Sequence, residues 1–185
     1  MGKQISKATT GLLILLVLAV ALTRKASAQS ASAISNLDLN RYMGTWYEIA
    51  RLPDKAQKNC VSNGIILFAL ADKANRFQVV NSCQAKDGYT NVRNASGKPA
   101  NKSGDGKLKV SYTWPFSQKY WVLAVDPSYE WVLVGSPNHK LLWVLSRTAT
   151  LSPDVLATIE AKAATQGFAT SKLIISTQAV PPAAE

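Results

Sequence analysis

Between residues 44 and 147, apolar and polar side chains alternate in short runs, and clusters of Asp, Asn, Gly, Lys and Pro separate these runs. Such alternation is typical of β-strands with one buried face, and the polar clusters are typical of turns. The pattern predicts eight antiparallel strands, at about residues 44–52, 61–70, 76–83, 89–96, 106–114, 119–126, 129–135 and 140–147. Eight short strands favour a closed barrel or a sandwich, and eight is the number at which a barrel can hold one small ligand.

One helix is expected after the strands. Ser152 is a suitable N-cap, Pro153 fits the first helical position, and Gly167 stands where helices commonly end. Between them, apolar residues recur at helical spacing: Val155, Leu156, Ile159 and Ala163. We expect this stripe to pack against the outside of the barrel, and a short ninth strand to follow at residues 173–176. The fold class is therefore all-β, an eight-stranded up-and-down barrel or a sandwich with one C-terminal α-helix.

The length of 185 residues favours one globular domain, preceded here by an export signal. Residues 1–28 combine lysines, an apolar run and an Ala-Ser-Ala ending, which is the pattern of a secretory signal peptide. The apolar run would be about 18 Å long as a helix, too short for a bilayer core of about 30 Å, and an uncleaved anchor is the alternative. We expect residues 29–178 to form the domain, with a mobile leader over 29–40 and a flexible tail over 179–185.

The net charge of +10 bears on the partners of the chain. Residues 1–28 hold four basic and no acidic side chains, so their removal leaves a charge of +6. The remaining basic residues are scattered over predicted turns and strand ends, and no basic stripe with interleaved aromatic residues occurs. We therefore expect no nucleic-acid partner and at most a weak contact with an anionic membrane surface.

Cys60 and Cys83 are the two cysteines of the chain. They lie at the start of the second predicted strand and the end of the third, almost equally far from the turn at residues 72–75. A small bulge would bring them face to face across this hairpin. Because an exported protein folds in an oxidising compartment, we predict that they form a disulfide, which leaves no thiol for nucleophilic catalysis.

Three short motifs follow one another in the order of the lipocalin signature regions: Gly44-Thr45-Trp46-Tyr47, Asp126-Pro127-Ser128-Tyr129 and Arg147. With the longer phrases 44–51, 108–116 and 142–148, residues 36–178 resemble the lipocalin family. The resemblance is strongest to its bacterial branch, which is close to apolipoprotein D and the plant temperature-induced lipocalins. Many bacterial relatives carry a cysteine at the signal cleavage site, whereas this chain has Ala-Ser-Ala-Gln there. The expected protein is therefore periplasmic or secreted and is not lipid-anchored.

The resemblance implies that the signature residues are structural. Trp46 is expected inside the closed end of the barrel, with the guanidinium of Arg147 stacked across its indole. Gly44 would allow the chain to turn tightly beneath that indole. The whole structural set is Gly44, Trp46, Tyr47, Asp126, Tyr129 and Arg147.

A ligand would lie in the barrel cavity, or calyx, against the alternate residues that point inward. The fifth strand has a clear apolar face, and the sixth strand is assigned the inward set that begins at Trp121. The complete predicted lining is Glu48, Ile66, Phe68, Leu70, Val110, Tyr112, Trp114, Phe116, Trp121, Leu123, Val125, Trp143 and Leu145. No positive charge is expected inside, except at the rim. The rim lysines that could pair with a carboxylate or phosphate head group are Lys55, Lys58, Lys119 and Lys140.

The family resemblance implies a protein that binds and carries or stores small hydrophobic ligands, such as fatty acids, lysophospholipids or similar membrane-derived lipids. Two alternatives remain: a binder of a haem- or pigment-type chromophore, and a secreted interaction module whose core is filled by side chains. His139 is the only histidine, and neither a phosphate loop nor a Gly-x-Ser-x-Gly motif occurs. We therefore expect no enzyme activity, no metal site and no cofactor, in a monomer or weak homodimer.

Overall fold

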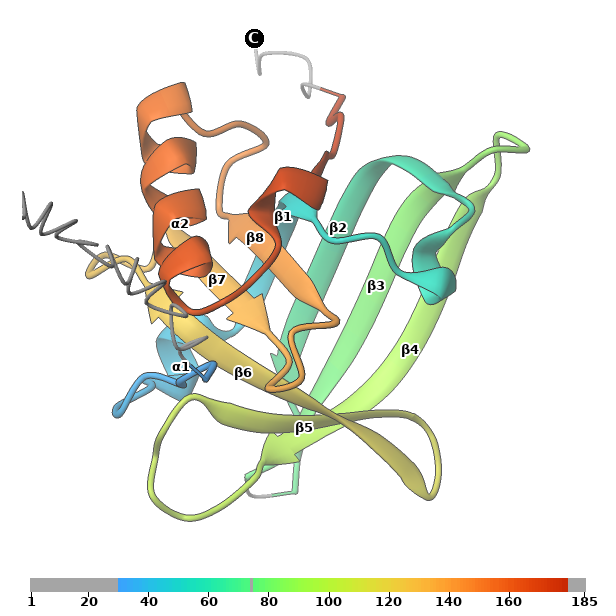
Figure 1. Cartoon of the computed structure of the whole chain (residues 1–185). Helices are drawn as coiled ribbons and strands as arrows, with labels where there is room; N and C mark the ends of the chain where they lie inside the picture. Colours follow the sequence, from blue (N-terminus) through green and yellow to red (C-terminus); the bar gives the residue numbers. More distant parts are fainter. Residues whose placement is uncertain (1–29, 74, 180–185) are drawn as a thin grey trace, which may run out of the picture.

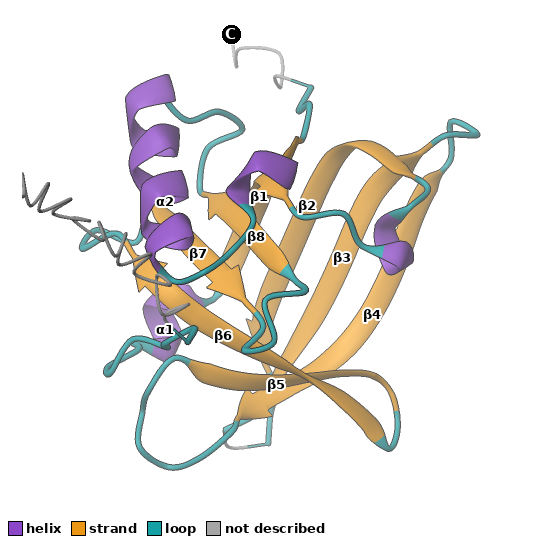
Figure 2. Cartoon of the chain, viewed as in Figure 1, coloured by secondary structure: helices purple, strands orange, loops and turns teal. Residues whose placement is uncertain are grey.

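The computed structural model describes residues 30–73 and 75–179 and shows a closed antiparallel β-barrel (Figures 1 and 2). Neighbouring strands pair in sequence order, and β1 pairs with both β2 and β8, which closes the barrel. The eight strands are β1 (Gly44–Arg51), β2 (Cys60–Leu70), β3 (Phe77–Ala85), β4 (Thr90–Pro99), β5 (Lys107–Thr113), β6 (Phe116–Val125), β7 (Trp131–Gly135) and β8 (Leu142–Ser146). The predicted all-β fold class is confirmed, and of the two predicted architectures the structure is the closed barrel and not the sandwich. The predicted signal peptide and most of the predicted tail lie outside the described residues.

One end of the barrel is closed by a short helix, α1 (Leu39–Tyr42), and the chain before it. The side chain of Asp38 caps this helix by accepting from the amides of Asn40 and Arg41. Before the helix, the Ile34 amide donates to the Val122 carbonyl at 2.9 Å, so this segment lies beside β6. Ala31 and Leu37 are buried. The expectation of a mobile leader over residues 29–40 is therefore wrong for the described part, because Leu37 packs in the core of the barrel and Ala31 in the outer core beside the C-terminal helix.

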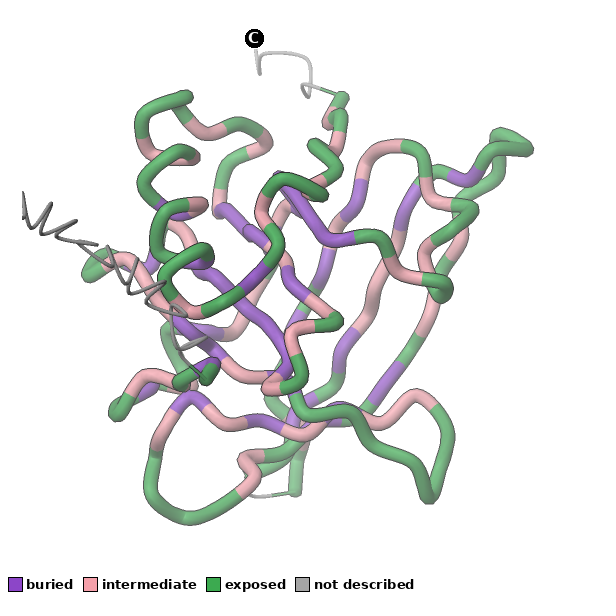
Figure 3. The backbone as a smooth tube through the Cα atoms, viewed as in Figure 1, coloured by how far each residue is buried: buried purple, intermediate pink, exposed green. Residues whose placement is uncertain are grey.

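The helix α2 (Pro153–Thr165) packs its apolar stripe on the outside of the barrel, as predicted. Ser152 caps its first turn, and Ile159 and Ala163 are fully buried. A second apolar core forms between this helix and the outer faces of the neighbouring strands. In Figure 3, buried stretches therefore concentrate on the strands beside α2, whereas β4 alternates between buried and exposed residues.

This second core corrects the predicted orientation of β6. Trp121 and Leu123 pack in the outer core with α2, whereas Tyr120 and Val122 point into the barrel. A β-bulge between Val122 and Ala124 then shifts the alternation. Both faces of β6 are apolar because both are covered, so the sequence alternation that distinguishes inside from outside is absent there.

After α2, a 3-10 helix η2 (Thr170–Lys172) leads to a ninth strand, β9 (Ile174–Ile175), which pairs with the end of β1. β1 pairs with β2 only from Gly44 to Tyr47, so the two strands separate toward the opposite end of the barrel. The segment that follows β9 lies along this separation, where the Asn63 amide donates to the Thr177 carbonyl at 2.8 Å. The C-terminal segment therefore closes the seam between β1 and β2 from outside. The described residues contain no helix long and apolar enough to cross a membrane.

Candidate functional site

The closed end of the barrel is built around Trp46 and Arg147. The Arg147 guanidinium carbon lies 3.6 Å from the centre of the indole ring of Trp46, which is fully buried. This guanidinium also donates to the carbonyls of Arg41, Met43 and Thr45 at 2.6–2.8 Å. The predicted stacking is present. In addition, three main-chain oxygens accept hydrogen bonds from the guanidinium N–H groups.

Gly44 is required beneath this pair. Its φ of +98° lies in the left-handed region, and a Cβ there would approach the Arg147 guanidinium to 3.2 Å. The hairpin signature lies at the same end: the Tyr129 hydroxyl accepts from the Asp38 amide at 2.9 Å, and the Asp126 carboxylate accepts from the Ser128 amide at 2.8 Å. Tyr47, by contrast, packs in the outer core beside α2.

Aromatic rings form a floor above the closed end. The ring centres of Tyr42 and Phe68 are 4.9 Å apart, and Phe68 lies 6.0 Å from both Phe77 and Tyr120. Burial raises the pKa values of the phenols of Tyr42 and Tyr120, so both are neutral. Neither hydroxyl oxygen has a hydrogen-bond partner among the described residues. This floor is solid protein and leaves space for a ligand only above it.

A hollow lies between this floor and the open end of the barrel. Its empty volume is about 550 Å³ including the open mouth, but its unobstructed interior is about 40 Å³, enough for a few water molecules. Four of the predicted lining residues surround it: Glu48, Ile66, Tyr112 and Trp143. The other lining residues are Asp54, Ala56, Gln57, Cys60, Gly64, Ile65, Asn81, Ser82, Cys83, Asn91, Arg93 and Gln118. The hollow is therefore more polar than the sequence suggested.

The remaining residues of the predicted lining lie elsewhere. Phe68, Val110 and Leu145 are buried in the packed core below the hollow, and Val125 packs beside them. Trp121 and Leu123 are on the outside of the barrel. Leu70, Trp114 and Phe116 are 56%, 89% and 76% exposed, at the two ends of the barrel. Of these three, Trp114 lies in the β5–β6 turn and Phe116 is the first residue of β6 beside it, where β-alternation is interrupted and carries no information on orientation.

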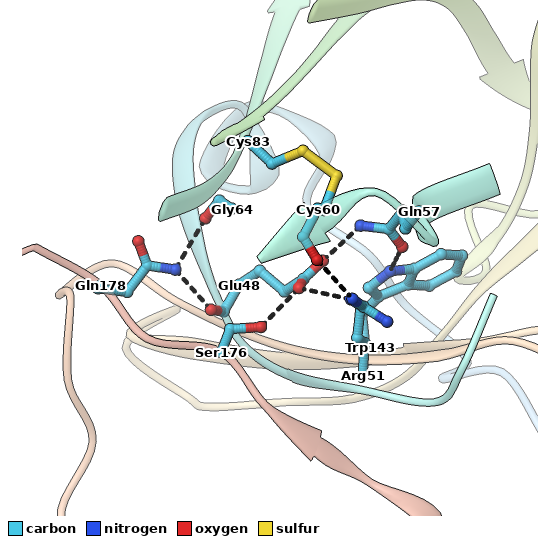
Figure 4. A network of polar contacts seen from close by, with 9 residues as sticks. All are labelled: Glu48, Arg51, Gln57, Cys60, Gly64, Cys83, Trp143, Ser176 and Gln178. Atoms are coloured by element: carbon cyan, nitrogen blue, oxygen red, sulfur yellow. Dashed lines mark hydrogen bonds and ion pairs between the residues drawn. A yellow bond between two sulfur atoms is a disulfide. The ribbon is translucent and has the colours of Figure 1, made fainter. Parts of the chain in front are cut away.

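Glu48 is the centre of a buried polar network at the seam between β1 and β2 (Figure 4). It is 3% exposed, and its carboxylate pairs with the guanidinium of Arg51, with Nε and Oε1 3.1 Å apart. The same carboxylate accepts from Ser176 Oγ at 2.6 Å and from Gln57 Nε2 at 2.7 Å. Removal of Arg51 would leave the buried carboxylate without its counter-charge.

Gln178 and Gly64 also contact Glu48 at the seam between β1 and β2. The Gln178 amide donates to the carbonyls of Glu48 and Gly64, at 2.7 and 3.0 Å, and so joins β1 to β2 where their own pairing has ended. A Cβ on Gly64 would lie 2.9 Å from the Glu48 Cβ, so the wall has room for glycine alone at this position.

Gln57 connects this network to the mouth of the barrel. It belongs to a 3-10 helix, η1 (Lys55–Gln57), in the loop between β1 and β2. Its amide nitrogen donates to Glu48, and its amide oxygen accepts from the Trp143 indole nitrogen at 3.0 Å. Glu48 and Trp143 belong to the neighbouring strands β1 and β8, so the two bonds fix the loop to one wall of the hollow at its mouth. Lys55 and Lys58 of this loop were predicted at the rim, but no sequence signal indicated that Gln57 would bind Glu48 and Trp143 inside the mouth.

The predicted disulfide between Cys60 and Cys83 is present, with the Cα atoms 5.6 Å apart. It joins β2 to β3 at the open end, beside the irregular pairing where Cys60 stands opposite Ala85. A disulfide is typical of proteins that fold in an oxidising environment, such as the periplasm or the cell exterior.

One wall of the hollow carries polar side chains that sequence analysis missed: Asn81, Asn91, Arg93 and Gln118. The alternation in β4 was misleading, because Val92 is 53% exposed and its polar neighbours point inward. Buried Ala95 on the same strand was the available signal, since residues two apart share a face.

A closed floor, an open hollow and an outer helix together define a calyx-shaped β-barrel. Residues 37–178 match the family model described as a lipocalin-like domain, and the chain belongs to the lipocalin family, whose barrels bind hydrophobic ligands. Temperature-induced lipocalin-1 of Arabidopsis thaliana is 34% identical over 157 residues, which cover 80% of this chain and 83% of that protein. The outer membrane lipoprotein Blc of Citrobacter freundii is 34% identical over 163 residues, with 85% and 88% covered. The structure of insecticyanin from the tobacco hornworm Manduca sexta has the same fold, with a TM-score of 0.64 and 20% identity over 81% of this chain and 90% of that one.

Proposed function

We propose that this protein binds one small lipid with a polar end, such as a fatty acid or a lysophospholipid, in the hollow above the aromatic floor, and carries or stores it. The single observation that supports this most is the composition of the hollow. Apolar side chains such as Ile66 and the Trp143 ring lie in it together with a wall of amides and an arginine. An amphipathic ligand can satisfy both kinds of surface at once.

The energetics are compatible with such a ligand. Burial of an acyl chain contributes roughly 0.8 kcal/mol per CH₂, which offsets the cost of ordering the ligand. The unobstructed interior of about 40 Å³ is too small for an acyl chain, so the loop that carries Gln57 must move as the ligand enters. Displacement of that loop would join the interior to the empty space at the mouth, which amounts to about 550 Å³ together with the adjoining solvent.

We propose that the protein acts as a binding protein without catalysis, in the periplasm or outside the cell. The disulfide supports the oxidising compartment. Both cysteines of the chain are joined to each other, which supports a form that is free of a lipid anchor, unlike the relative whose name describes an outer membrane lipoprotein.

The test is displacement of a fluorescent fatty acid, cis-parinaric acid, from the purified and delipidated protein. We expect saturable binding with one site per chain, and displacement by oleic acid and by a lysophospholipid. Native mass spectrometry of the complex gives the stoichiometry independently. Absence of saturable binding, with a correctly folded protein by circular dichroism, would exclude this function and favour the interaction module with a filled core.

A further inference from the structure

Arg93 projects into the hollow from β4. Ala95 and Gly97 of the same strand are buried against the inner core, and Arg93 shares their face because it lies two positions further along the strand. On β3, Asn81 stands directly opposite Arg93 in the strand register and also lines the hollow. The guanidinium is half-buried and belongs to the wall of the cavity.

This guanidinium differs from the other interior arginines in what it contacts. Arg51 pairs with the Glu48 carboxylate, and Arg147 donates to three main-chain carbonyls. Arg93 instead lies with its guanidinium carbon 4.4 Å from the ring centre of Tyr112. Within the described residues, no carboxylate oxygen lies within 4.0 Å of it, and no hydrogen bond engages its N–H groups. One face of the Arg93 guanidinium is therefore packed against the Tyr112 ring, and its N–H groups can still donate hydrogen bonds to a ligand.

The neighbours of Arg93 can also donate to an anion. Asn81 Nδ2 donates to the Tyr112 hydroxyl at 2.7 Å, which leaves the phenolic hydrogen of Tyr112 for another acceptor. Burial raises the pKa of Tyr112, so this phenol stays protonated at neutral pH. The amides of Asn91 and Gln118 line the same hollow.

The two carboxylates of the hollow are already engaged. Glu48 is held by Arg51, Ser176 and Gln57, and Asp54 accepts from the Ala56 amide at 3.1 Å. They belong to β1 and the loop after it, whereas Arg93 belongs to β4. Three of the rim lysines considered above, Lys55, Lys119 and Lys140, line a separate cleft at the outer edge of the mouth. Among the residues that line the hollow, Arg93 is the cation, and Asp54 acts on the neighbouring Tyr112, where burial and the Asp54 carboxylate both raise the pKa of the phenol.

We propose that Arg93 binds the anionic head group of the lipid, with Tyr112 and Asn81 as neutral donors and the tail against Ile66 and Trp143. This inference rests on the proposed function and names its ligand class: single-chain lipids with a carboxylate or a phosphate. A guanidinium suits both groups because its planar N–H donors match their paired oxygens. Selectivity for charge then comes from inside the barrel, and the exposed lysines contribute little because water screens them.

The test compares cis-parinaric acid with its neutral methyl ester on the wild-type protein, R93Q, R93M and the matched surface control K119Q. We expect the wild type to bind the acid about tenfold more tightly than the ester, and R93Q and R93M to lose that preference while they retain ester affinity within about twofold. K119Q should behave as the wild type. Competition by oleate and by lysophosphatidylethanolamine then distinguishes a carboxylate head group from a phosphate. If R93Q is no longer competed by oleate but is still competed by the lysophospholipid, Arg93 binds a carboxylate. If neither lipid competes on R93Q, Arg93 binds both kinds of anion.

The outcomes distinguish this proposal from the one it rests on. Binding of neither probe to the folded wild type would refute the proposed function itself. Equal affinity of the wild type for acid and ester would overturn the role of Arg93 and leave the proposed function intact. The same conclusion would follow if R93Q and R93M weakened both probes alike, since Arg93 would then merely brace Tyr112 where β4 and β5 stop pairing beyond Ser96 and Ser111. Because the preference for acid over ester is measured on the wild type, its absence would overturn the role of Arg93 even if the variants did not fold, whereas retained ester affinity shows that R93Q and R93M are folded.

Discussion

The two ends of this barrel use the same kinds of side chain for opposite purposes. At the closed end, Arg147 stacks on Trp46 and donates to three carbonyls, and the aromatic floor above it is packed solid. At the open end, Arg93 stacks on Tyr112 and keeps its donors uncommitted, and the strands around it separate. This difference indicates that the residues that stabilise the fold lie mainly at the closed end of the barrel, and that the residues proposed to bind a ligand lie at the open end. Apart from the disulfide, which constrains the unfolded chain, substitutions at the closed end should change mainly stability, and substitutions at the open end should change mainly binding.

The largest effect is expected for Trp46→Ala at the closed end. Trp46 is fully buried and fills the space between Tyr42 and Arg147, so its loss should lower the free energy of unfolding by about 3–5 kcal/mol. Urea unfolding followed by circular dichroism measures this change. The matched control is Trp114→Ala at the open end, where the indole is 89% exposed and the loss should stay within about 0.5 kcal/mol. Similar losses for the two variants would contradict the division.

Removal of the disulfide comes next. Cys60 and Cys83 are separated by 23 positions, and release of a loop of this size should lower the free energy of unfolding by about 3 kcal/mol when both are replaced by serine. Hydrogen exchange should show faster opening of β2 and β3 near the mouth, with the floor around Phe68 still protected. Uniformly faster exchange in both regions would show that the two ends are not independent.

Arg147→Lys should have a smaller effect. Lysine keeps the charge but cannot stack as a plane on Trp46 while donating to three carbonyls, so we expect a loss of roughly 1–2 kcal/mol in the free energy of unfolding. Fatty-acid affinity, measured in the same preparation below its unfolding temperature, should not change. A variant with normal stability and weakened binding would reverse the roles assigned to the two ends.

The smallest change in stability is expected for Gln57→Ala, which removes the side chain that attaches the β1–β2 loop to β1 and β8. Two hydrogen bonds are lost, to Glu48 and from Trp143, and their net contribution should be about 1 kcal/mol because water can replace them in the opened loop. With the loop released, a ligand should associate several-fold faster in stopped-flow fluorescence. Exposed Lys58→Ala in the same loop is the control. An unchanged association rate for Gln57→Ala would mean that the loop does not limit entry.

Much of this fold could be predicted because the physical pattern is local. Strand alternation located all eight strands, the caps located α2, and the positions of Cys60 and Cys83 around one turn predicted their disulfide. The prediction failed where alternation carries no information. β6 is apolar on both faces because α2 covers its outside. Tyr120 therefore points into the barrel and Trp121 points out of it, the reverse of the predicted orientation.

The polar half of the candidate site was harder to predict. Four lining residues were anticipated, but Gln57 lies in a loop, and its two bonds attach that loop to the neighbouring strands β1 and β8. Arg93 lies on a strand whose exposed Val92 mimics an inward-facing residue. Such contacts depend on closure of the barrel, which brings together strands that are distant in the sequence.

The central claim, that a lipid occupies the hollow above the floor, is tested most directly by filling that hollow. Asn81→Trp places an indole among the lining residues, and Asn94→Trp places the same group on exposed β4 surface outside the barrel. Circular dichroism checks that both variants are folded. The probe is the methyl ester of cis-parinaric acid, which needs no anion site. Its affinity should fall at least about tenfold for Asn81→Trp and remain unchanged for Asn94→Trp. Unchanged affinity of the filled variant would place the lipid elsewhere and contradict the account.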